Sequence, residues 1–215
     1  MDHQKETANF LTLNKRAFCF NEQGTGKTAS AIWAADYLME TKRVYRALII
    51  CPLSIMQSAW QADLFKFAMH RKVGVAYGDR DKRKAVIESD AQFVIINYDG
   101  VDIVADDIAK QNFDLIIIDE IESVMNHYGA STLNNKRTGK SAEALFNLLE
   151  MLITSTNKGK KGKLLLLDAD FHQRAFLFMN NPKFGNNILI HNTYKTTNKQ
   201  FMITNNNEYF FKIQI

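Results

Sequence analysis

A glycine-rich loop between two apolar segments constrains the fold of this chain more than any other feature of its sequence. The loop, residues 21–28, reads Asn-Glu-Gln-Gly-Thr-Gly-Lys-Thr; it follows the apolar residues 17–20 and precedes the alanine-rich residues 29–39. Its two glycines let the backbone turn tightly with N–H groups directed inward. A helix that begins near Lys27 adds unsatisfied N–H donors and the positive end of its dipole. A strand, a glycine-rich loop and a helix in this order predict a phosphate-binding loop.

The same loop supplies candidate ligands for a nucleotide. We expect Lys27 to reach the β and γ phosphates and the Thr28 hydroxyl to bind Mg²⁺. The other loop residues that we expect to bind the nucleotide are Gln23, Gly24, Thr25 and Gly26. Asn21 stands where the general pattern has glycine, and asparagine tolerates left-handed backbone angles. A chance Gly-Lys-Thr sequence in a surface turn is the alternative, which the flanking strand and helix disfavour.

A second motif places two acidic residues at the end of an apolar run. Residues 115–118 are Leu-Ile-Ile-Ile, and Asp119 and Glu120 follow directly. We expect Asp119 to bind Mg²⁺, often through water, as the complement of Thr28. Glu120 is the expected base that orients an attacking water. A strand that ends in a polar turn is the alternative; together with the phosphate loop, Lys27, Asp119 and Glu120 become candidate catalytic residues.

Short apolar runs bounded by polar residues predict the fold class. Runs that are apolar throughout are typical of strands buried on both faces of a parallel sheet. Helical segments between them favour a doubly wound α/β domain with its ligand at the carboxyl ends of the strands. We therefore expect a mainly parallel sheet of about seven strands. The expected strands are residues 17–20, 47–50, 73–76, 93–96, 115–118, 164–167 and 188–190.

Two helices carry recognisable signals. Ser54 and Gln57 have capping-box spacing at the start of a predicted helix over residues 54–67. Met56, Trp60, Leu64 and Phe67 fall on one face of that helix. Ser141 is positioned to cap a second helix, whose apolar face comprises Leu145, Phe146, Leu149 and Leu152.

Composition limits the broad class of protein. Hydrophobic residues make up 46% of the 215 residues and only two are proline, so we expect a packed core. The sequence contains no run of 18 or more apolar residues, so it predicts no membrane span. The acidic, polar start of the chain does not resemble a signal peptide. Cys19 and Cys51 lack metal-ligand spacing, and we expect both to be small core residues. Two such cysteines favour a reducing intracellular compartment (cytoplasm, nucleus or an infected host cell).

The basic excess of the chain is local. Residues 134–163 contain seven lysines and arginines against two glutamates, whereas the whole chain has a net charge of +4. Such a cluster is typical of a surface that faces nucleic acid. Two solvated lysine-rich loops would give the same composition, and this alternative stays open.

Together these motifs resemble the first RecA-like motor domain of superfamily two helicases and translocases. Up to Glu120 the resemblance is to the Swi/Snf-type branch, although that branch more usually has alanine after the Asp-Glu pair. The matching segments are His3-Gln4-Lys5 (the upstream glutamine motif), residues 21–28 (motif I), residues 51–54 with Gln57 and Trp60 (motif Ia), Tyr77-Gly78, residues 95–98 (motif Ib) and residues 119–122 (motif II).

The resemblance changes after Glu120. Residues 122–124, the basic loop after them and the Leu-Leu-Asp-Ala-Asp of residues 166–170 are similar to herpesvirus-type origin-binding helicases. In that position Asp168 and Asp170 would couple the nucleotide site to a second motor domain; capping of the following helix is the alternative. The resemblance covers residues 3 to about 190. It implies a RecA-like domain over 1–190 and a linker over 191–215 toward a second motor domain.

The resemblance also implies ligands and partners. The cofactors would be ATP and Mg²⁺, with Gln4 reading the adenine edge. The partner would be nucleic acid, DNA rather than RNA. A second RecA-like domain or another copy would supply an arginine finger, worth ~10³–10⁵ in rate in other phosphoryl-transfer enzymes. Residues on the nucleic-acid track would be Pro52, Leu53, Ser54, Asn97 and Tyr98.

Three functions are compatible with these motifs. The first is the ATP-driven motor domain of a DNA helicase or translocase, in replication, repair or recombination and of a viral or phage-like kind. The second is a phosphate-loop ATPase or kinase unrelated to nucleic acid, which the ordered motifs disfavour. The third is a module that binds ATP and DNA without turnover because a second motor domain is absent.

Overall fold

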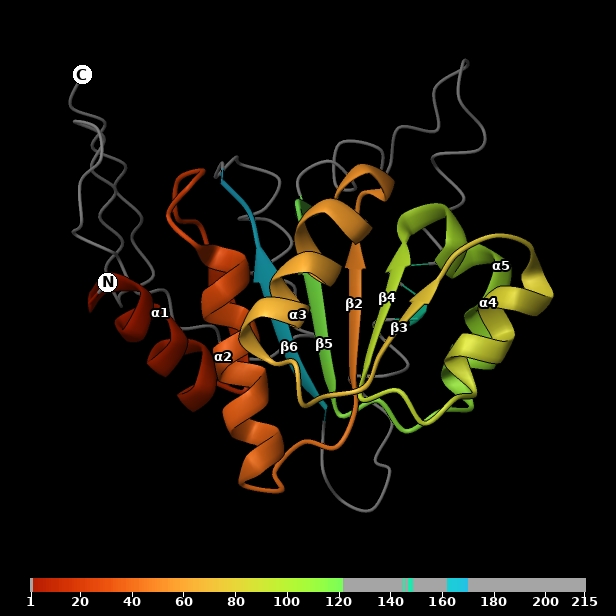
Figure 1. Cartoon of the computed structure of the whole chain (residues 1–215), viewed down its shortest axis with the longest axis horizontal. Helices are drawn as coiled ribbons and strands as arrows, with labels where there is room; N and C mark the ends of the chain where they lie inside the picture. The colour runs from red at the N-terminus through yellow and green to blue at the C-terminus, as the bar shows by residue number, and fades with distance from the viewer. Residues whose placement is uncertain (1, 122–144, 146, 149–161, 170–215) are drawn as a thin grey trace.

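A parallel β-sheet forms the centre of the molecule (Figure 1). The computed structural model describes residues 2–121, 145, 147–148 and 162–169. Within these residues the sheet has six strands in the order β1-β6-β5-β2-β4-β3, and all neighbouring pairs are parallel. The strands are β1 (Arg16–Cys19), β2 (Ala47–Cys51), β3 (Val73–Ala76), β4 (Phe93–Asn97), β5 (Leu115–Asp119) and β6 (Lys163–Leu167).

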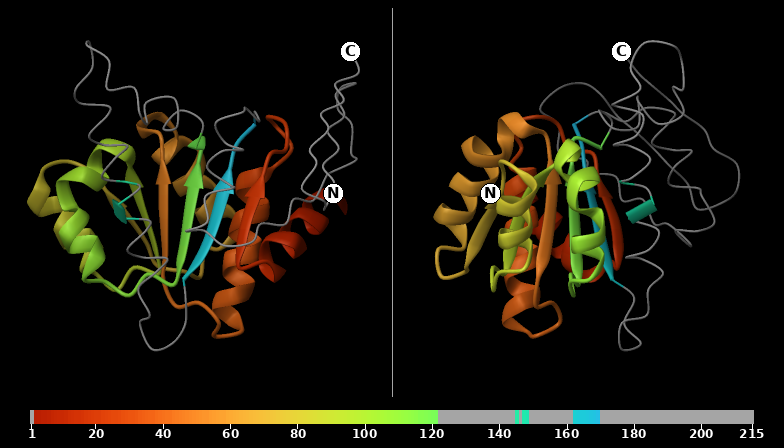
Figure 2. Two further views of the ribbon diagram at one scale, coloured as in Figure 1. Left: turned by 180° about the vertical axis from the view of Figure 1, so that it is seen from behind. Right: turned by 90° about the vertical axis from the view of Figure 1, so that its right-hand side faces the viewer.

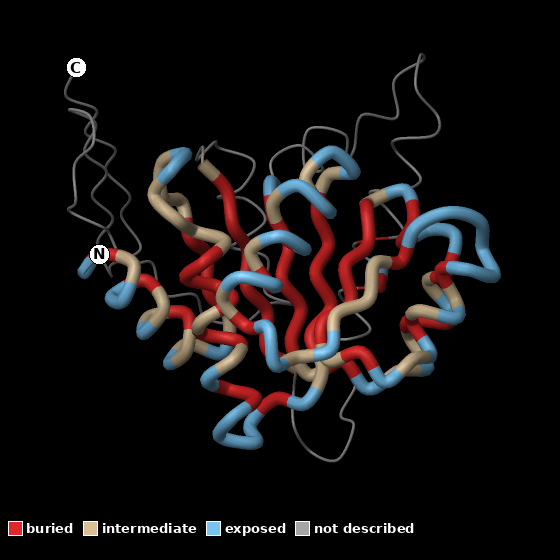
Figure 3. The backbone as a smooth tube through the Cα atoms, in the orientation of Figure 1, coloured by how far each residue is buried: buried red, intermediate tan, exposed pale blue. Residues whose placement is uncertain are grey.

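The predicted doubly wound α/β fold is confirmed. Each described strand lies within one residue, at either end, of an apolar run that predicted it, and the seventh predicted run, 188–190, lies outside the described residues. Strands β2, β4, β5 and β6 are buried along their whole length (Figure 3). Burial on both faces explains why these strands lack the polar alternation of a half-exposed sheet.

Helices cover both faces of the sheet (Figure 2). Alternate residues of β2 divide between two apolar cores: Leu48 and Ile50 face one core, and Ile49 and Cys51 face the other. The second core contains apolar residues of α1, α2, η2 and α3, whereas the first contains residues of α4 and α5. The helices are α1 (Asp2–Leu13), α2 (Lys27–Glu40), η1 (Leu53–Ile55), η2 (Met56–Gln61), α3 (Ala62–Phe67), α4 (Arg80–Ile87) and α5 (Tyr98–Ala109).

The segment predicted as one helix over residues 54–67 is three shorter helical pieces. A 3₁₀ turn, η1, leads into a single π-helical stretch, η2, and only α3 has α-helical hydrogen bonding. The predicted capping box is wrong, because Pro52 precedes the first turn and no side chain caps it. The predicted buried face is confirmed at Met56, Trp60 and Leu64, each at most 2% exposed.

Other predicted features fall partly outside the described residues. Leu145 and Leu148 are helical and buried, which agrees with the predicted second helix, whereas Ser141, Phe146, Leu149 and Leu152 are not described. Of the seven basic residues of the 134–163 window, the structure describes only Lys163. That ammonium group is buried and donates to the carbonyls of Thr12 and Asn14, so Lys163 does not contribute to a basic surface.

Both cysteines are buried and free. Burial raises the pKa of the Cys19 thiol to about 11 and also raises the pKa of the Cys51 thiol, so both stay protonated at neutral pH. They are small core residues, and the compartment of the protein stays a prediction. Among the residues that the structure describes, no helix has the length and apolar character needed to cross a membrane.

Candidate nucleotide site and adjoining surface

The loop between β1 and α2 has the backbone geometry of a phosphate cradle. Gly24 and Gly26 have φ angles of 75° and 81°, in the left-handed region that glycine tolerates best. Gly26 is the N-cap of α2, and no side chain caps this helix end. The N–H groups of the first turn of α2 and the positive end of its dipole are therefore directed at the loop.

Asn21 takes part in the loop through its side chain. Its Nδ2 atom donates to Thr7 Oγ1 of α1 at 3.1 Å. The φ angle of Asn21 is not positive. In this loop the residues with left-handed φ angles are the two glycines. The tolerance of asparagine for left-handed backbone angles is therefore not used at this position.

Lys27 lies folded against the loop. Its Nζ atom donates to the carbonyl of Asn21 at 2.6 Å and to that of Glu22 at 3.1 Å. Its charge also acts on Cys19 at the end of β1 and on Asp119 at the end of β5, lowering the pKa of each. The ammonium group thus contacts the loop and is near enough to the acidic end of β5 for its charge to act there.

Helix α1 packs against the loop and brings two side chains to it. The Gln4 amide donates to the carbonyl of Thr25 at 3.2 Å, and His3 Nε2 lies 3.3 Å from the same oxygen. A Cβ atom at Gly26 would lie 2.0 Å from Gln4 Nε2, so the amide occupies the space above that glycine. Gln4 was expected in the site; the proximity of His3 was not, because its position in the sequence gave no chemical signal.

Asp119 is buried at the end of β5, with 6% of its surface exposed. The indole N–H of Trp60 donates to its Oδ2 atom at 2.9 Å, and the N–H of Glu120 donates to Oδ1 at 3.1 Å. Burial raises the pKa of the carboxyl group to about 6, while the Trp60 hydrogen bond and the charge of Lys27 act in the opposite direction. The hydrogen bond from Trp60 to Asp119 was missed from the sequence, which placed Trp60 on a buried helix face and in motif Ia but did not identify its partner.

Glu120 is exposed directly beyond the buried end of β5. Its φ angle of 56° is left-handed, which is uncommon for a residue with a Cβ atom. The chain therefore turns sharply at Glu120, and the side chains of Asp119 and Glu120 differ in burial although they are adjacent. Tyr98, from the start of α5, supports the turn by donating its hydroxyl to the carbonyl of Asp119.

Sheet register brings the two predicted motifs to one edge. Cys19 of β1 and Asp119 of β5 both pair with Leu167 of β6, so the two strands end at the same level with β6 between them. The carboxyl ends of the strands lie along the upper edge of the sheet in Figure 1. Asp168 follows β6 at this edge, buried; its N–H donates to the Cys19 carbonyl and its Oδ1 accepts from Ala169 N–H. Asp170 lies outside the described residues.

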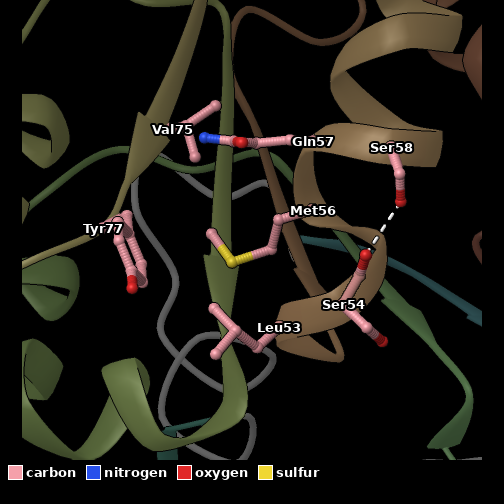
Figure 4. A pocket seen from close by; sticks show the side chains of 7 residues that line it. All are labelled: Leu53, Ser54, Met56, Gln57, Ser58, Val75 and Tyr77. Carbon is pink, nitrogen blue, oxygen red and sulfur yellow. Dashed lines mark hydrogen bonds between the residues drawn. The ribbon is translucent and has the colours of Figure 1, made fainter.

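The first three residues of the predicted nucleic-acid track lie beside a pocket at the same edge. Pro52 precedes η1, and Leu53 and Ser54 are exposed within it. Figure 4 shows the side chains around a pocket of about 330 Å³ between the η1–η2 segment and the end of β3. The lining residues are Leu53, Ser54, Met56, Gln57, Ser58, Val75 and Tyr77.

Asn97 and Tyr98, the other two predicted track residues, face inward. Asn97 is 5% exposed, and its Oδ1 accepts from the Arg83 guanidinium at 2.8 Å. Arg83 is itself buried and also donates to the carbonyls of Gly78 and Ala76, each at 2.9 Å. Direct contact of Asn97 with nucleic acid stays a prediction; in the structure its side chain fixes Arg83 between the ends of β3 and β4.

The residues at this edge fit a nucleotide with a divalent cation. The uncapped start of α2, the left-handed glycines and the Lys27 ammonium suit phosphate oxygens. A carboxylate such as Asp119 and a hydroxyl such as Thr28 are oxygen ligands of the kind that Mg²⁺ prefers. Among the described residues no group of three or more His, Cys, Asp or Glu side chains forms a metal cluster.

Comparison with known proteins yields one family and several relatives. The SNF2-related domain matches residues 3–155. One relative is a protein of Acanthamoeba polyphaga mimivirus whose name assigns it to replication-origin binding. It is 37% identical over 103 residues, which are 48% of this chain and 12% of the mimivirus protein. A second mimivirus protein, R8, named as a helicase but uncharacterised, is 37% identical over 100 residues, 44% of this chain and 9% of its own.

Two solved structures from Sulfolobus solfataricus share the fold. The SWI2/SNF2 ATPase core in complex with dsDNA aligns over 86% of this chain and 32% of its own, with a TM-score of 0.57 and 19% identity. The SWI2/SNF2 ATPase core domain aligns over 77% of this chain and 30% of its own, with a TM-score of 0.53 and 20% identity. The chain thus spans about a tenth of the mimivirus relatives and about a third of these structures.

Proposed function

The chain belongs to the SNF2-related domain family, and from this we propose that it is the ATP-binding motor domain of a DNA helicase or translocase. The observation that carries the proposal is the convergence of Lys27 and Asp119 at one sheet edge. Cys19 and Asp119 lie level across β6, so the phosphate loop and the acidic motif serve one ligand. Ligands of open α/β sheets bind at this carboxyl edge.

The nucleotide is held mainly by the backbone of the loop. Residues 23–26 surround the phosphates with N–H groups, and Lys27 moves from the Asn21 and Glu22 carbonyls to the β and γ phosphates. Gln4, which already contacts the loop through Thr25, recognises the adenine edge.

The acidic motif contributes to binding the metal and to activating the water. Thr28 and Asp119 hold Mg²⁺, which when bound neutralises charge on the phosphates. Glu120 orients the attacking water and accepts its proton. The burial of Asp119 and the exposure of Glu120 support this division, because the metal ligand is fixed and the base faces solvent.

Nucleic acid binds beyond the nucleotide, along the η1 segment. Pro52, Leu53 and Ser54 lie at its surface, with Asn97 and Tyr98 behind them. The partner is DNA rather than RNA. This part draws on the solved structural neighbour, whose core is in complex with dsDNA. Contacts in such a track are mainly to phosphates and therefore weakly sequence-specific.

The complete motor needs a second RecA-like domain. We assign residues 1–190 to the first domain and 191–215 to the linker, with Asp168 and Asp170 as coupling residues. The second domain, or another copy of this chain, supplies an arginine finger to the transferred phosphate. The position of Asp168 against the Cys19 carbonyl, next to the phosphate loop, supports the coupling role.

ATP hydrolysis measured with and without duplex DNA tests the function. We expect DNA to stimulate turnover, and Glu120→Gln to lower the rate ~10²–10⁴-fold while leaving ATP affinity within about twofold. Hydrolysis of ATP that ignores DNA, together with phosphorylation of a small-molecule acceptor, would contradict the motor assignment. Binding of both ATP and DNA with no turnover would instead identify a module that requires its second domain.

A further inference from the structure

A hydrogen bond joins two buried side chains that lie 59 residues apart in the sequence. The Trp60 indole N–H donates to Asp119 Oδ2 at 2.9 Å, with Trp60 fully buried and Asp119 6% exposed. A buried indole N–H needs an acceptor, and most acceptors in proteins are backbone carbonyls or water. Here the acceptor is the carboxylate assigned to the metal.

The carboxylate of Asp119 is held at both oxygens. Trp60 donates to Oδ2, and the backbone N–H of Glu120 donates to Oδ1 at 3.1 Å. Two donors on opposite oxygens fix the plane of the carboxyl group, and each oxygen retains a further lone pair. Hydrogen bonds of this kind orient metal-ligating carboxylates and favour their ionised form.

Trp60 reaches Asp119 from an unusual backbone element. It belongs to η2, the π-helical stretch Met56–Gln61, and short π-helical stretches are frequently found at functional sites. Three residues of the same stretch, Met56, Gln57 and Ser58, line the pocket at the sheet edge (Figure 4). One short element therefore carries both the wall of that pocket and the donor to the carboxylate.

We propose that Trp60 is a positioning residue, which orients the Asp119 carboxylate for Mg²⁺ and ties the η2 segment to the metal site. The inference rests on the proposed function, in which Asp119 binds Mg²⁺ beside the nucleotide. If Trp60 were a core residue alone, its removal would lower stability without changing how nucleotide binding depends on Mg²⁺.

Calorimetric titration of the whole chain with ADP, in EDTA and over a series of Mg²⁺ concentrations, separates these roles. For Trp60→Phe we expect metal-free ADP affinity within about twofold of wild type. We expect the Mg²⁺ concentration that gives half of the metal-linked gain in affinity to rise about 10–100-fold, as for loss of other outer-shell partners. Trp33→Phe is the matched control, because the Trp33 ring packs on Phe67 at 5.7 Å and should leave the Mg²⁺ dependence unchanged.

A second readout keeps both tryptophans in place. Chain labelled with 5-fluorotryptophan gives two ¹⁹F resonances, which Trp33→Phe assigns. Adding Mg²⁺ to the ADP-saturated protein should shift the Trp60 resonance and leave that of Trp33 in place. An unmoved Trp60 resonance, or wild-type Mg²⁺ dependence in Trp60→Phe, would overturn the positioning role alone. Failure of wild-type protein to bind ADP in any condition would overturn the nucleotide site and this inference with it.

Discussion

Gly26 is the residue at which the phosphate loop, helix α1 and helix α2 meet. Its φ angle of 81° is left-handed, and a Cβ atom here would lie 2.0 Å from the Gln4 amide nitrogen. Gly24 has a similar φ angle of 75°, but a Cβ atom there would have nothing within 4 Å. The two glycines of one motif therefore serve different purposes: both permit the turn, and only Gly26 makes room for Gln4.

Alanine substitutions at these two glycines should differ in cost. Gly24→Ala should lower the free energy of unfolding by ~1 kcal/mol from left-handed strain. Gly26→Ala should lower it by ~1 kcal/mol more, because the Gln4 amide must leave its hydrogen bond to Thr25. Urea unfolding of both variants, each with and without Gln4→Ala, measures this difference as a double-mutant cycle. Equal costs, or an excess at Gly26 that survives Gln4→Ala, would show that Gln4 does not occupy this space in solution.

Strand β6 begins with a buried charge that contacts the end of helix α1. Lys163, the first residue of this strand, donates to the carbonyl of Thr12, in the last turn of α1, and to that of Asn14, directly after the helix. Burial lowers the pKa of its ammonium group from 10.5 to about 8. Between pH 8 and 10.5 the unfolded chain therefore binds more protons than the folded chain, and the contribution of Lys163 to stability rises with pH.

The pH dependence of Lys163→Met tests this assignment. Relative to the variant, wild type should gain stability on the order of 2 kcal/mol between pH 7 and pH 10, as the buried lysine loses its charge in the folded state. Guanidinium unfolding at the two pH values measures the change, and Lys66→Met, at an exposed lysine of α3, controls for loss of a surface charge. A difference between wild type and Lys163→Met that is the same at both pH values would be inconsistent with a buried ammonium.

The elements differ in how far sequence alone predicts them. Strands such as β2 and β5 were predicted to within a residue, because burial on both faces leaves a continuous apolar signal. The π-helical η2 was predicted as α-helix, because the spacing of Met56, Trp60 and Leu64 fits either form.

Polar partners within the site were less predictable than the elements. Asp119 and Lys27 were predicted to meet because parallel strands end at one edge. The Trp60 donor and the burial of Asn97 against Arg83 were not predicted, because periodicity indicates that a side chain is buried but not which group it contacts.

At the scale of the whole molecule, we propose that this chain is one half of a motor. The SNF2-related match confirms the predicted superfamily two domain, and the chain spans about a third of the solved ATPase cores. The resemblance of the later residues to origin-binding helicases stays a prediction, since most of them lie outside the described part. We expect a DNA track built from one domain to bind mainly through phosphates and therefore with little sequence specificity.

DNA affinity should accordingly depend on salt. We expect the affinity for a fluorescently labelled duplex to fall about tenfold or more between 50 and 200 mM salt, because phosphate contacts release counterions. Fluorescence anisotropy at a series of salt concentrations gives the slope, and two duplexes of unrelated sequence should give the same line. Salt-independent binding, or strong preference for one duplex, would rule out a phosphate-tracking surface.

The most direct measurement is a calorimetric titration of this chain with MgADP, wild type beside Lys27→Ala. The Lys27 ammonium donates a hydrogen bond to the loop, and its charge interacts with that of Asp119. Loss of this ammonium should weaken MgADP binding about 10–150-fold, which corresponds to one hydrogen bond to a charged group. Lys42→Ala, in the turn after α2, is the matched control and should bind as wild type. Equal MgADP affinity in wild type and Lys27→Ala would contradict the nucleotide site on which the proposed function rests.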